Sequence, residues 1–306
     1  MNIPDRKYPL VSIVVATYNG ERFLEEQLDS LVHQTYPNLE IIVVDDGSKD
    51  KTPAILQAYA AKYPQLRVYT NPSNLGYVKN FEKGCSLATG DYISLADQDD
   101  VWDLEKTMLL MDAMEAYPMI YCDSAFVDED LNSLGRTHKD LKNLQDFDNP
   151  LYFATDNCVG GHALIMKKEV VQRAMPFPVE MPHDLWLAFV ATFSGTIKYF
   201  DQALVKWRQH GYNITSKKKD KYVKIAEARK RAEIFYRSCP PSLMKEKQVL
   251  NKLQQSYQSY SLSNNFLRMS LFFRYRHYFL AMKKRSEFRK TLFCLKMFVK
   301  LREHVA

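Results

Sequence analysis

Strand-like and helix-like segments alternate regularly through the first third of the chain. Short apolar runs rich in β-branched residues predict strands, whereas apolar residues at helical spacing predict helices. The predicted strands are 10–16, 40–44, 66–69 and 92–96, and the predicted helices between them are 21–33, 51–63 and 77–88. Because each helical crossover returns the chain to a neighbouring parallel strand, the series predicts an α/β fold. We expect a Rossmann-like, mostly parallel central sheet flanked by helices.

Polar residues follow three of these strands directly. They are Thr17-Tyr18-Asn19, Asp45-Asp46 and Asp97-Gln98-Asp99-Asp100. The carboxyl ends of parallel strands meet at one edge of a sheet, and open α/β sheets bind their ligands there. We therefore expect the three polar strand ends to converge on one cleft.

The third strand end places three carboxylates in four positions. Carboxylates at such short range repel one another unless a cation holds them, and hard oxygen ligands favour Mg²⁺ or Mn²⁺. The alternative is a solvated acidic turn, in which Asp99 or Asp100 caps the helix expected to begin near Leu104. The convergence with the other polar strand ends favours the metal site.

The charge is distributed unevenly along the chain. Residues 1–216 hold 19 Lys+Arg and 30 Asp+Glu, a net charge of −11, whereas residues 217–306 hold 23 and 6, a net charge of +17. The split predicts a first domain at 1–215 and a basic helical region at 216–306, which Pro240-Pro241 divides into two helical parts. No nucleic-acid recognition motif is present and the first domain is acidic, so no nucleic-acid partner is expected.

Aromatic and basic residues alternate in the helical segments 267–282 and 292–301 of this tail. Helices of this composition can lie in the interface of an anionic membrane. Alternatively, the tail packs its apolar stripe on the first domain and leaves its basic face in water. The sequence leaves both interpretations open.

The cysteine content and the N-terminus bear on the compartment. Five cysteines without a CxxC pair argue against a disulfide framework or a zinc site and favour a reducing compartment. The first residues lack a signal peptide, and no apolar stretch approaches the roughly 18 residues of a spanning helix. We expect a cytoplasmic protein, either free or peripheral on the inner face of the plasma membrane.

Four motifs, taken together and in order over 10–215, resemble those of family 2 glycosyltransferases. They are Thr17-Tyr18-Asn19-Gly20, Val44-Asp45-Asp46-Gly47-Ser48, Asn74-Leu75-Gly76 and Ala96-Asp97-Gln98-Asp99-Asp100-Val101-Trp102. The resemblance implies the GT-A fold and a nucleotide-sugar donor. Three segments are most similar to the corresponding motifs of bacterial rhamnosyltransferases of cell-surface polysaccharide synthesis. They are Asp97–Trp102, His183–Trp186 and Trp207–His210. The segment 135–157 is polar and irregular, which predicts a mobile loop on the acceptor side.

The resemblance also implies which residues bind the nucleobase. The backbone at Ala16 and the ring of Tyr18 would contact the base, and Asp46 would accept a hydrogen bond from a pyrimidine imide N–H, which favours UDP or dTDP donors. The alternatives are a tyrosine that only packs at a strand end and an Asx turn at Asp45-Asp46.

The resemblance also implies which residues bind the metal and the diphosphate. Asp99 would bind Mn²⁺ or Mg²⁺, and Asp97 would contact the ribose or a metal-bound water. Asp100 would then cap the following helix. His210 would be a ligand of the metal or of the diphosphate, and Arg208 would contact the diphosphate; a lone histidine can equally be a surface or packing residue.

Asp184 lies where the family places its catalytic base. Many relatives have Glu-Asp here, whereas this chain has His183-Asp184. The alternative is an N-cap of the apolar helix that follows, and the two roles are compatible.

The resemblance, with these residues in their implied roles, predicts an inverting, metal-dependent glycosyltransferase. It would move a sugar, rhamnose, from a dTDP- or UDP-sugar to a polyprenyl-linked glycan or growing surface polysaccharide. The alternatives are a non-catalytic nucleotide-sugar-binding or membrane scaffold protein and a nucleotidyltransferase. Transfer without pyrophosphate release would exclude both.

Overall fold

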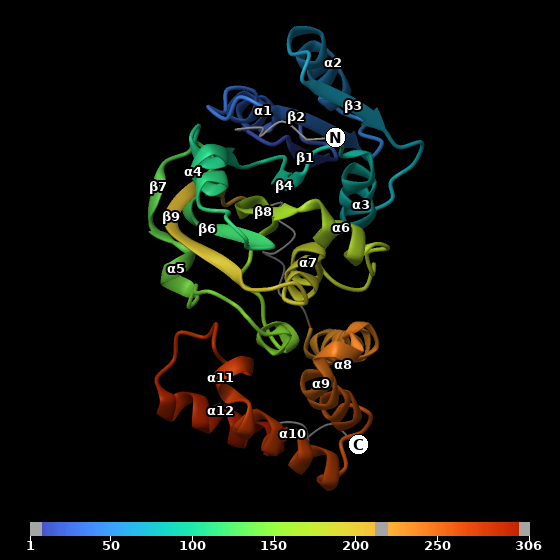
Figure 1. Ribbon diagram of the computed structural model, residues 1–306, viewed down its shortest axis with the longest axis vertical. Coiled ribbons are helices and arrows are strands. Elements are labelled where there is room, and N and C mark those ends of the chain that lie inside the picture. The colour runs from blue at the N-terminus through green and yellow to red at the C-terminus, as the bar shows by residue number, and fades with distance from the viewer. Residues whose placement is uncertain (1–7, 212–219, 300–306) are drawn as a thin grey trace, which may run out of the picture. The chain divides into compact units, whose positions relative to one another are not determined.

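The computed structural model describes residues 8–211 and 220–299 (Figure 1). The chain divides into two compact units. Among the described residues, the first unit holds 8–140 and 159–211, and the second holds 141–158 and 220–299. The predicted domain boundary at 215/216 lies outside the described residues. The second unit also takes up an internal segment that the sequence interpretation left in the first domain.

A single sheet runs through the first unit, with nine strands among the described residues. Its first half has the order β3-β2-β1-β4, and all pairs in it are parallel, as predicted. The strands are β1 (Val11–Thr17), β2 (Leu39–Asp45), β3 (Leu66–Thr70) and β4 (Tyr92–Asp97). The connecting helices, also close to the predicted ranges, are α1 (Leu24–Val32), α2 (Thr52–Lys62) and α3 (Tyr77–Leu87).

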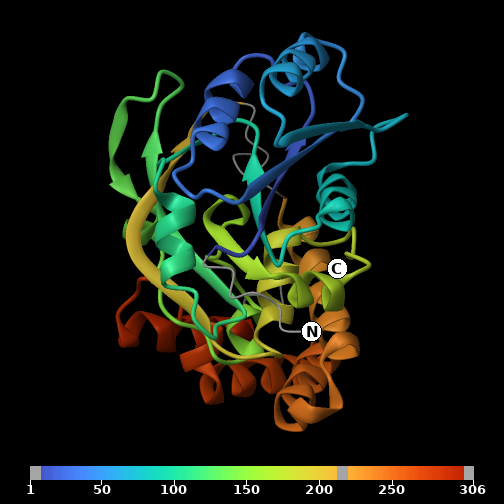
Figure 2. The same cartoon turned by 45° about the horizontal axis from the view of Figure 1, so that its top comes forward.

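The second half of the sheet is mixed and continues in the order β8-β6-β9-β5, with β7 paired to β6. Its strands are β5 (Val101–Trp102), β6 (Met119–Val127), β7 (Ser133–Thr137), β8 (Leu164–Lys167) and β9 (Ile197–Arg208). β8 is antiparallel to both β4 and β6, whereas β6 and β9 are parallel. Figure 2 shows β9 as one long curved strand.

Four further helices belong to the first unit in the part of the chain that the structure describes. They are α4 (Lys106–Asp112), α5 (His138–Leu141, at the junction with the second unit), α6 (Lys168–Ala174) and α7 (His183–Ala191). Gly161–Ala163 forms a 3₁₀ turn directly before β8.

Close contact between helix and sheet fixes the core of the first unit. Gly84 on α3 leaves no room for a side chain, since an added Cβ would lie 2.3 Å from a methyl carbon of Val14 on β1. On the other face of β1, Ile13 and Val15 are fully buried in a cluster with Leu28 of α1. Helices α1 and α3 therefore pack closely against opposite faces of β1.

The second unit consists mainly of helices. They are α8 (Lys221–Ser238), α9 (Met244–Ser256), α10 (Leu262–Arg274), α11 (Arg276–Phe279) and α12 (Glu287–Val299), with 3₁₀ turns at η1 (Pro150–Ala154) and η4 (Pro241–Leu243). The chain breaks between α8 and α9 at Pro240-Pro241 as predicted, but further breaks make the prediction of two helical parts wrong.

The segment 135–157, expected to be a mobile loop, begins with the end of β7 and with α5, and from Leu141 on it packs within this unit. Asp156 forms ion pairs with Lys142 at 2.6 Å and with Lys283 at 3.0 Å. Thr155 Oγ1 donates a hydrogen bond of 2.5 Å to the carbonyl of Phe279. The bonds to Phe279 and Lys283 join the segment to α11 and to the chain that follows it.

No helix among the described residues is both long enough and apolar enough to cross a membrane. The five cysteines are all buried free thiols.

Candidate active site

The three polar strand ends lie side by side at one edge of the sheet. In the register of the parallel strands, Ala16 pairs with Asp97 and Thr17 pairs with Asp45. The predicted convergence is therefore correct. The residues that follow β1, β2 and β4 form the floor of the candidate active site.

The loop after β1 presents an aromatic ring. The ring of Tyr18 is 46% exposed, so it is not a packing residue of the core. Its backbone N–H donates to Gln98 Oε1 at 2.8 Å, and Gln98 Nε2 donates to the carbonyl of Tyr18 at 3.2 Å. These two bonds fix the predicted base-binding loop, including Ala16 at the end of β1, to the acidic segment.

Asp46, after β2, is buried and accepts several hydrogen bonds. Its carboxylate receives Leu75 N–H at 2.8 Å, Gly76 N–H at 2.9 Å and Asn71 Nδ2 at 2.7 Å. The neighbouring Asp45 accepts the backbone N–H of Ser48, three residues further on, at 3.1 Å. Asp46 thus shapes the Asn74-Leu75-Gly76 loop, and its contact with a base remains a prediction.

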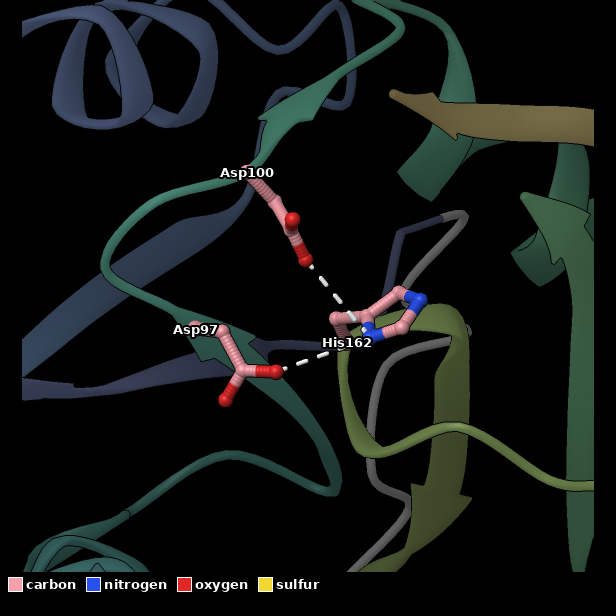
Figure 3. Close-up of side chains that lie close together, drawn as sticks. All are labelled: Asp97, Asp100 and His162. Atoms are coloured by element: carbon pink, nitrogen blue, oxygen red, sulfur yellow. Dashed lines mark ion pairs between the residues drawn. The ribbon is translucent and has the colours of Figure 1, made fainter. Parts of the chain in front are cut away.

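The acidic strand end divides into two groups. In the first, shown in Figure 3, Asp97 and Asp100 point toward one ring nitrogen of His162. The distances from His162 Nδ1 are 3.5 Å to Asp97 Oδ2 and 3.6 Å to Asp100 Oδ2. The other nitrogen, Nε2, lies 2.9 Å from Ser124 Oγ. The sequence interpretation missed His162; its only signal was the preceding pair of glycines, which allows close backbone approach.

In the second group, Asp99 meets His210. Asp99 Oδ2 lies 2.8 Å from His210 Nε2, so the two predicted metal ligands are in direct contact. Asp100 does not cap a helix. It is 1% exposed and accepts the backbone N–H of Arg208 at 3.0 Å, while α4 begins at Lys106 without a side-chain cap.

The electrostatics of these carboxylates indicate a site for a cation. Burial, reinforced by the neighbouring Asp99 and Asp97, raises the pKa of Asp100 well above its usual range. Burial and Asp97 also raise the pKa of Asp99. For Asp97, burial is outweighed by the contact with His162, so that its pKa is lowered. The three neighbouring carboxylates therefore repel one another, and the positive charge around them does not balance their negative charge.

The spacing of the ligands suits a small divalent ion. Ligands of octahedral Mg²⁺ lie about 2.1 Å from the ion, which separates adjacent ligand atoms by about 3 Å. The Asp99–His210 pair, at 2.8 Å, fits this spacing. Asp97, Asp100 and His162 also offer ligand atoms within 4.8 Å of one another, and among the described residues the second oxygen of buried Asp100 has no hydrogen-bond partner. Either group could hold the ion.

Arg208 supports the acidic segment from β9. Its buried guanidinium donates to the carbonyl of Asp99 at 2.8 Å and to that of Glu129, pairs with Glu26, and lies 4.4 Å from the ring centre of Phe23. These contacts anchor the backbone that carries the carboxylates. The predicted contact of Arg208 with a diphosphate stays a prediction.

Asp184 lies in the first turn of α7, one residue beyond the helix start. The N-cap position is Pro182, and the Asp184 carboxylate instead accepts the N–H of Leu185 at 2.6 Å. Burial raises the pKa of Asp184 to about 7, with a further contribution from the charge of Asp97. A Cβ added to Gly161 would lie 3.6 Å from Asp184 Cβ, so the aspartate lies beside the turn that carries His162.

The fold and these strand ends define the class of protein. The structure resembles S. aureus TarS 1-349 in complex with UDP-GlcNAc, with a TM-score of 0.60 and 18% identity over 95% of this chain and 81% of that chain. It also resembles the mannosyltransferase PcManGT from Pyrobaculum calidifontis in complex with GDP-Man and Mn²⁺, with a TM-score of 0.52 and 19% identity over 97% and 83% of the two chains. At this identity the likeness establishes the fold, and the predicted GT-A fold is confirmed.

The family follows from the sequence. The family described as glycosyl transferase family 2 matches residues 12–173, more than half of the chain. The chain is also 28% identical over 249 residues, 74% of each protein, to an uncharacterized glycosyltransferase of Haemophilus influenzae. The chain belongs to glycosyl transferase family 2, as its motifs predicted.

Proposed function

We propose that this glycosyltransferase inverts the configuration of a sugar, depends on a divalent metal and uses a dTDP- or UDP-sugar as donor. The acceptor would be a polyprenyl-linked glycan or a growing surface polysaccharide. The observation that carries the proposal is the position of Asp184, a carboxylate with a pKa raised to about 7, beside the acidic strand end. Donor and base would thus meet at one edge of the sheet.

The donor would lie along the three strand ends. The exposed ring of Tyr18 and the backbone of Ala16 would hold the base, Asp46 would bind its imide edge, and Asp97 would contact the ribose. The similar structures of TarS with UDP-GlcNAc and PcManGT with GDP-Man support a nucleotide-sugar donor.

Asp99 and His210 would hold Mn²⁺ or Mg²⁺, with Asp97, Asp100 and His162 as the alternative set. When bound, the ion neutralises the diphosphate and stabilises the charge of the departing nucleotide. The structure of PcManGT in complex with Mn²⁺ supports a divalent metal in this fold, and the choice of ligands rests on the contacts above. Arg208 would keep the carbonyl of Asp99 in place through its 2.8 Å hydrogen bond.

The transfer itself would depend on Asp184. As the acceptor hydroxyl attacks the anomeric carbon, the Asp184 carboxylate removes its proton. A new bond forms between carbon and acceptor oxygen while the bond to the diphosphate oxygen breaks on the opposite face. The electron pair leaves with the nucleoside diphosphate, and the anomeric configuration is inverted.

A pH dependence follows from this role. The base must be ionised, and the pKa of Asp184 is about 7, so kcat/KM is expected to fall about tenfold per pH unit below that value. The measurement is a pH profile of initial transfer rates with saturating Mn²⁺. A profile that stays flat from pH 8 down to pH 5 would contradict the assignment of Asp184 as the base.

The transferred sugar is proposed to be rhamnose. The support is the similarity of Asp97–Trp102, His183–Trp186 and Trp207–His210 to rhamnosyltransferase motifs. The test is a panel of dTDP-L-rhamnose, UDP-GlcNAc and GDP-mannose with a polyprenyl-diphosphate-linked glycan, followed by mass spectrometry of the product. Addition of a deoxyhexose mass from the first donor alone would support the proposal, and exclusive transfer from another donor would reject it.

The helix α12 supports a peripheral association with anionic membrane. Its residues Phe288, Leu292 and Leu295 are 72%, 40% and 46% exposed and follow the spacing of a single helix face. The exposed cations Arg285, Arg289 and Lys296 lie nearby in the sequence. An exposed apolar face beside basic residues suits the interface of an anionic bilayer.

The combined substitution of Phe288→Ser and Leu292→Ser is expected to weaken binding to phosphatidylglycerol vesicles about tenfold, because it removes the apolar face and keeps the charge. Co-sedimentation measures the effect. The control is Val179→Ser, at an apolar position of the first unit that is 60% exposed. Unchanged binding of the double variant would favour the alternative interpretation, in which the tail is only a packing element.

A further inference from the structure

A buried lysine next to the acidic strand end takes no part in the proposed transfer. Lys106, the first residue of α4, is 0% exposed, although lysine is almost never fully buried unless it is paired. Its Nζ donates a hydrogen bond of 2.9 Å to the carbonyl oxygen of His162 and lies 2.9 Å from the ring centre of Trp102. Burial of a cation costs free energy, and these two contacts compensate for it.

The carbonyl that Lys106 binds belongs to the 3₁₀ turn Gly161–Ala163, which we call the His162 turn. Three successive carbonyls at this turn and at the start of β8 each accept a hydrogen bond from a buried side chain. The pairs are Lys106 Nζ with His162, Cys122 Sγ with Ala163 at 3.4 Å, and Ser94 Oγ with Leu164 at 2.6 Å. Side chains of α4, β6 and β4 thus hold one short piece of backbone, and of the three only the lysine brings a charge.

The His162 turn contacts both sides of the proposed active site. On the donor side, His162 Nδ1 lies 3.5 Å from Asp97 Oδ2 and 3.6 Å from Asp100 Oδ2. On the other side, Gly161 packs against the first turn of α7, since an added Cβ would lie 3.6 Å from the Cβ of Asp184. A displacement of the turn would therefore move the partner of the donor-side carboxylates and the support of the base together.

The lysine joins this turn to the acidic segment. Trp102, on which the ammonium lies, is 2% exposed, and its backbone N–H donates to Ser30 Oγ at 3.1 Å. On the other side of Lys106, the backbone N–H of Thr107 donates to Gln34 Oε1 at 3.0 Å. The ammonium therefore has a fixed position, and it is close enough to Asp100 for the two charges to act on each other. An opposite charge at this place reduces the repulsion among the carboxylates.

We propose that Lys106 is a positioning residue for the transfer, which fixes the His162 turn between the acidic strand end and Asp184 through its hydrogen bond to the His162 carbonyl. The inference rests on the proposed function, since it takes Asp184 as the base. Lys106 contacts neither donor nor acceptor and moves no proton. Because a misplacement of about 1 Å can lower a rate about 100-fold, loss of this bond should affect the chemical step more than donor binding.

The first measurement follows His162 in the absence of substrates and metal. The chain has seven histidines, so protein with ¹³C-labelled imidazole carbons gives a simple NMR spectrum, and the signal missing from His162→Gln identifies His162. Lys106→Met keeps an unbranched side chain and removes the charge and the donor; an apolar residue in place of a buried charge is often tolerated. At constant pH and with EDTA, this variant should shift the His162 signal and leave those of the exposed His33 and His277 in place.

The second measurement separates rate from binding. Lys106→Met is expected to lower kcat at least about tenfold and to leave the Kd of dTDP-L-rhamnose or UDP-GlcNAc, from calorimetry with Mn²⁺, within about twofold. Lys106→Arg retains a charged donor and should recover part of kcat. The matched control is Lys62→Met, which removes an exposed lysine whose Nζ lies 4.9 Å from the ring centre of Tyr63. It should change neither quantity.

The inference requires that both the His162 signal and kcat change in Lys106→Met, and it is overturned if either stays as in the wild type. An equal loss of donor binding and rate would also overturn it, because it would show a general structural role. If Lys106→Met does not fold, Lys106→Gln, which removes the charge and shortens the side chain, undergoes the same two measurements. Failure of both variants to fold would show that the lysine stabilises the whole unit, against the inference. Absence of transfer by the wild-type protein would instead reject the proposed function, whereas the His162 signal would still show whether Lys106 fixes the turn.

Discussion

Asp184→Asn is expected to lower the transfer rate by about 10³-fold, within the range that a general base contributes, and to leave donor binding unchanged. Asparagine retains the shape of the side chain and can still accept the N–H of Leu185, which the carboxylate receives at 2.6 Å. It cannot accept a proton from the acceptor. The measurements are kcat from initial rates and the donor Kd from calorimetry.

Two controls separate the base from a structural role. Asp184→Glu keeps a carboxylate at a shifted position and should retain more activity than the asparagine variant. Asp112→Asn removes an exposed carboxylate at the end of α4 and should have no effect on either quantity. Turnover close to that of the wild type in Asp184→Asn would show that this carboxylate only supports the first turn of α7.

Asp99→Asn is expected to weaken Mn²⁺ binding by at least about 100-fold, because even the partners of metal ligands contribute 10–100-fold to affinity. Metal binding can be read directly from the signal of free Mn²⁺ in electron paramagnetic resonance, with and without UDP or dTDP. Donor binding to this variant should then no longer respond to EDTA, whereas that of the wild type should weaken on chelation.

The second group of potential ligands provides the matched comparison. His210→Ala should reproduce the effect of Asp99→Asn, since the two side chains are 2.8 Å apart. His162→Ala tests Asp97, Asp100 and His162, whose ligand atoms lie within 4.8 Å of one another. Loss of Mn²⁺ binding in His162→Ala together with normal binding in Asp99→Asn would move the metal to that group. Equal donor affinity with and without metal would contradict the proposed role of a metal ion in donor binding.

The parallel half of the sheet was predictable because each of its strands and helices can be recognised from a short stretch of sequence. β1, β2 and β4 are mostly apolar runs that are largely buried, and β1 and β2 are each followed directly by a helix. The sequence therefore predicted that the carboxyl ends of these strands meet at one edge of the sheet. The mixed half depends on pairing between segments that are distant in the sequence. β5 has only two residues, too few to give a strand pattern. β9 continues through the polar pair Asp201-Gln202, and its pairing with β6 shifts register at this point.

The same distinction applies to the site. Asp99 and His210 were named as ligands from their motifs, and the structure brings them into contact. Asp100 was expected to cap a helix because a helical pattern follows closely in the sequence. Instead, β5 begins at the next residue and pairs with β9, which places the backbone of Arg208 against the Asp100 carboxylate. Long-range pairing of this kind has no local signature.

The chain path through the second unit restricts how the C-terminal helices can be exchanged. Residues 141–158 leave the first unit, pack through η1 against α9 and α11, and return to the first unit at Val159. Asn149 donates a hydrogen bond of 3.0 Å to Glu246 of α9, and Asp156 is held by Lys283. The C-terminal helices thus form one structural unit with the inserted segment 141–158. A chimera that joins them to the catalytic unit of a relative must transplant the inserted segment as well, and coordinated replacement of both pieces is the condition for a stable hybrid enzyme.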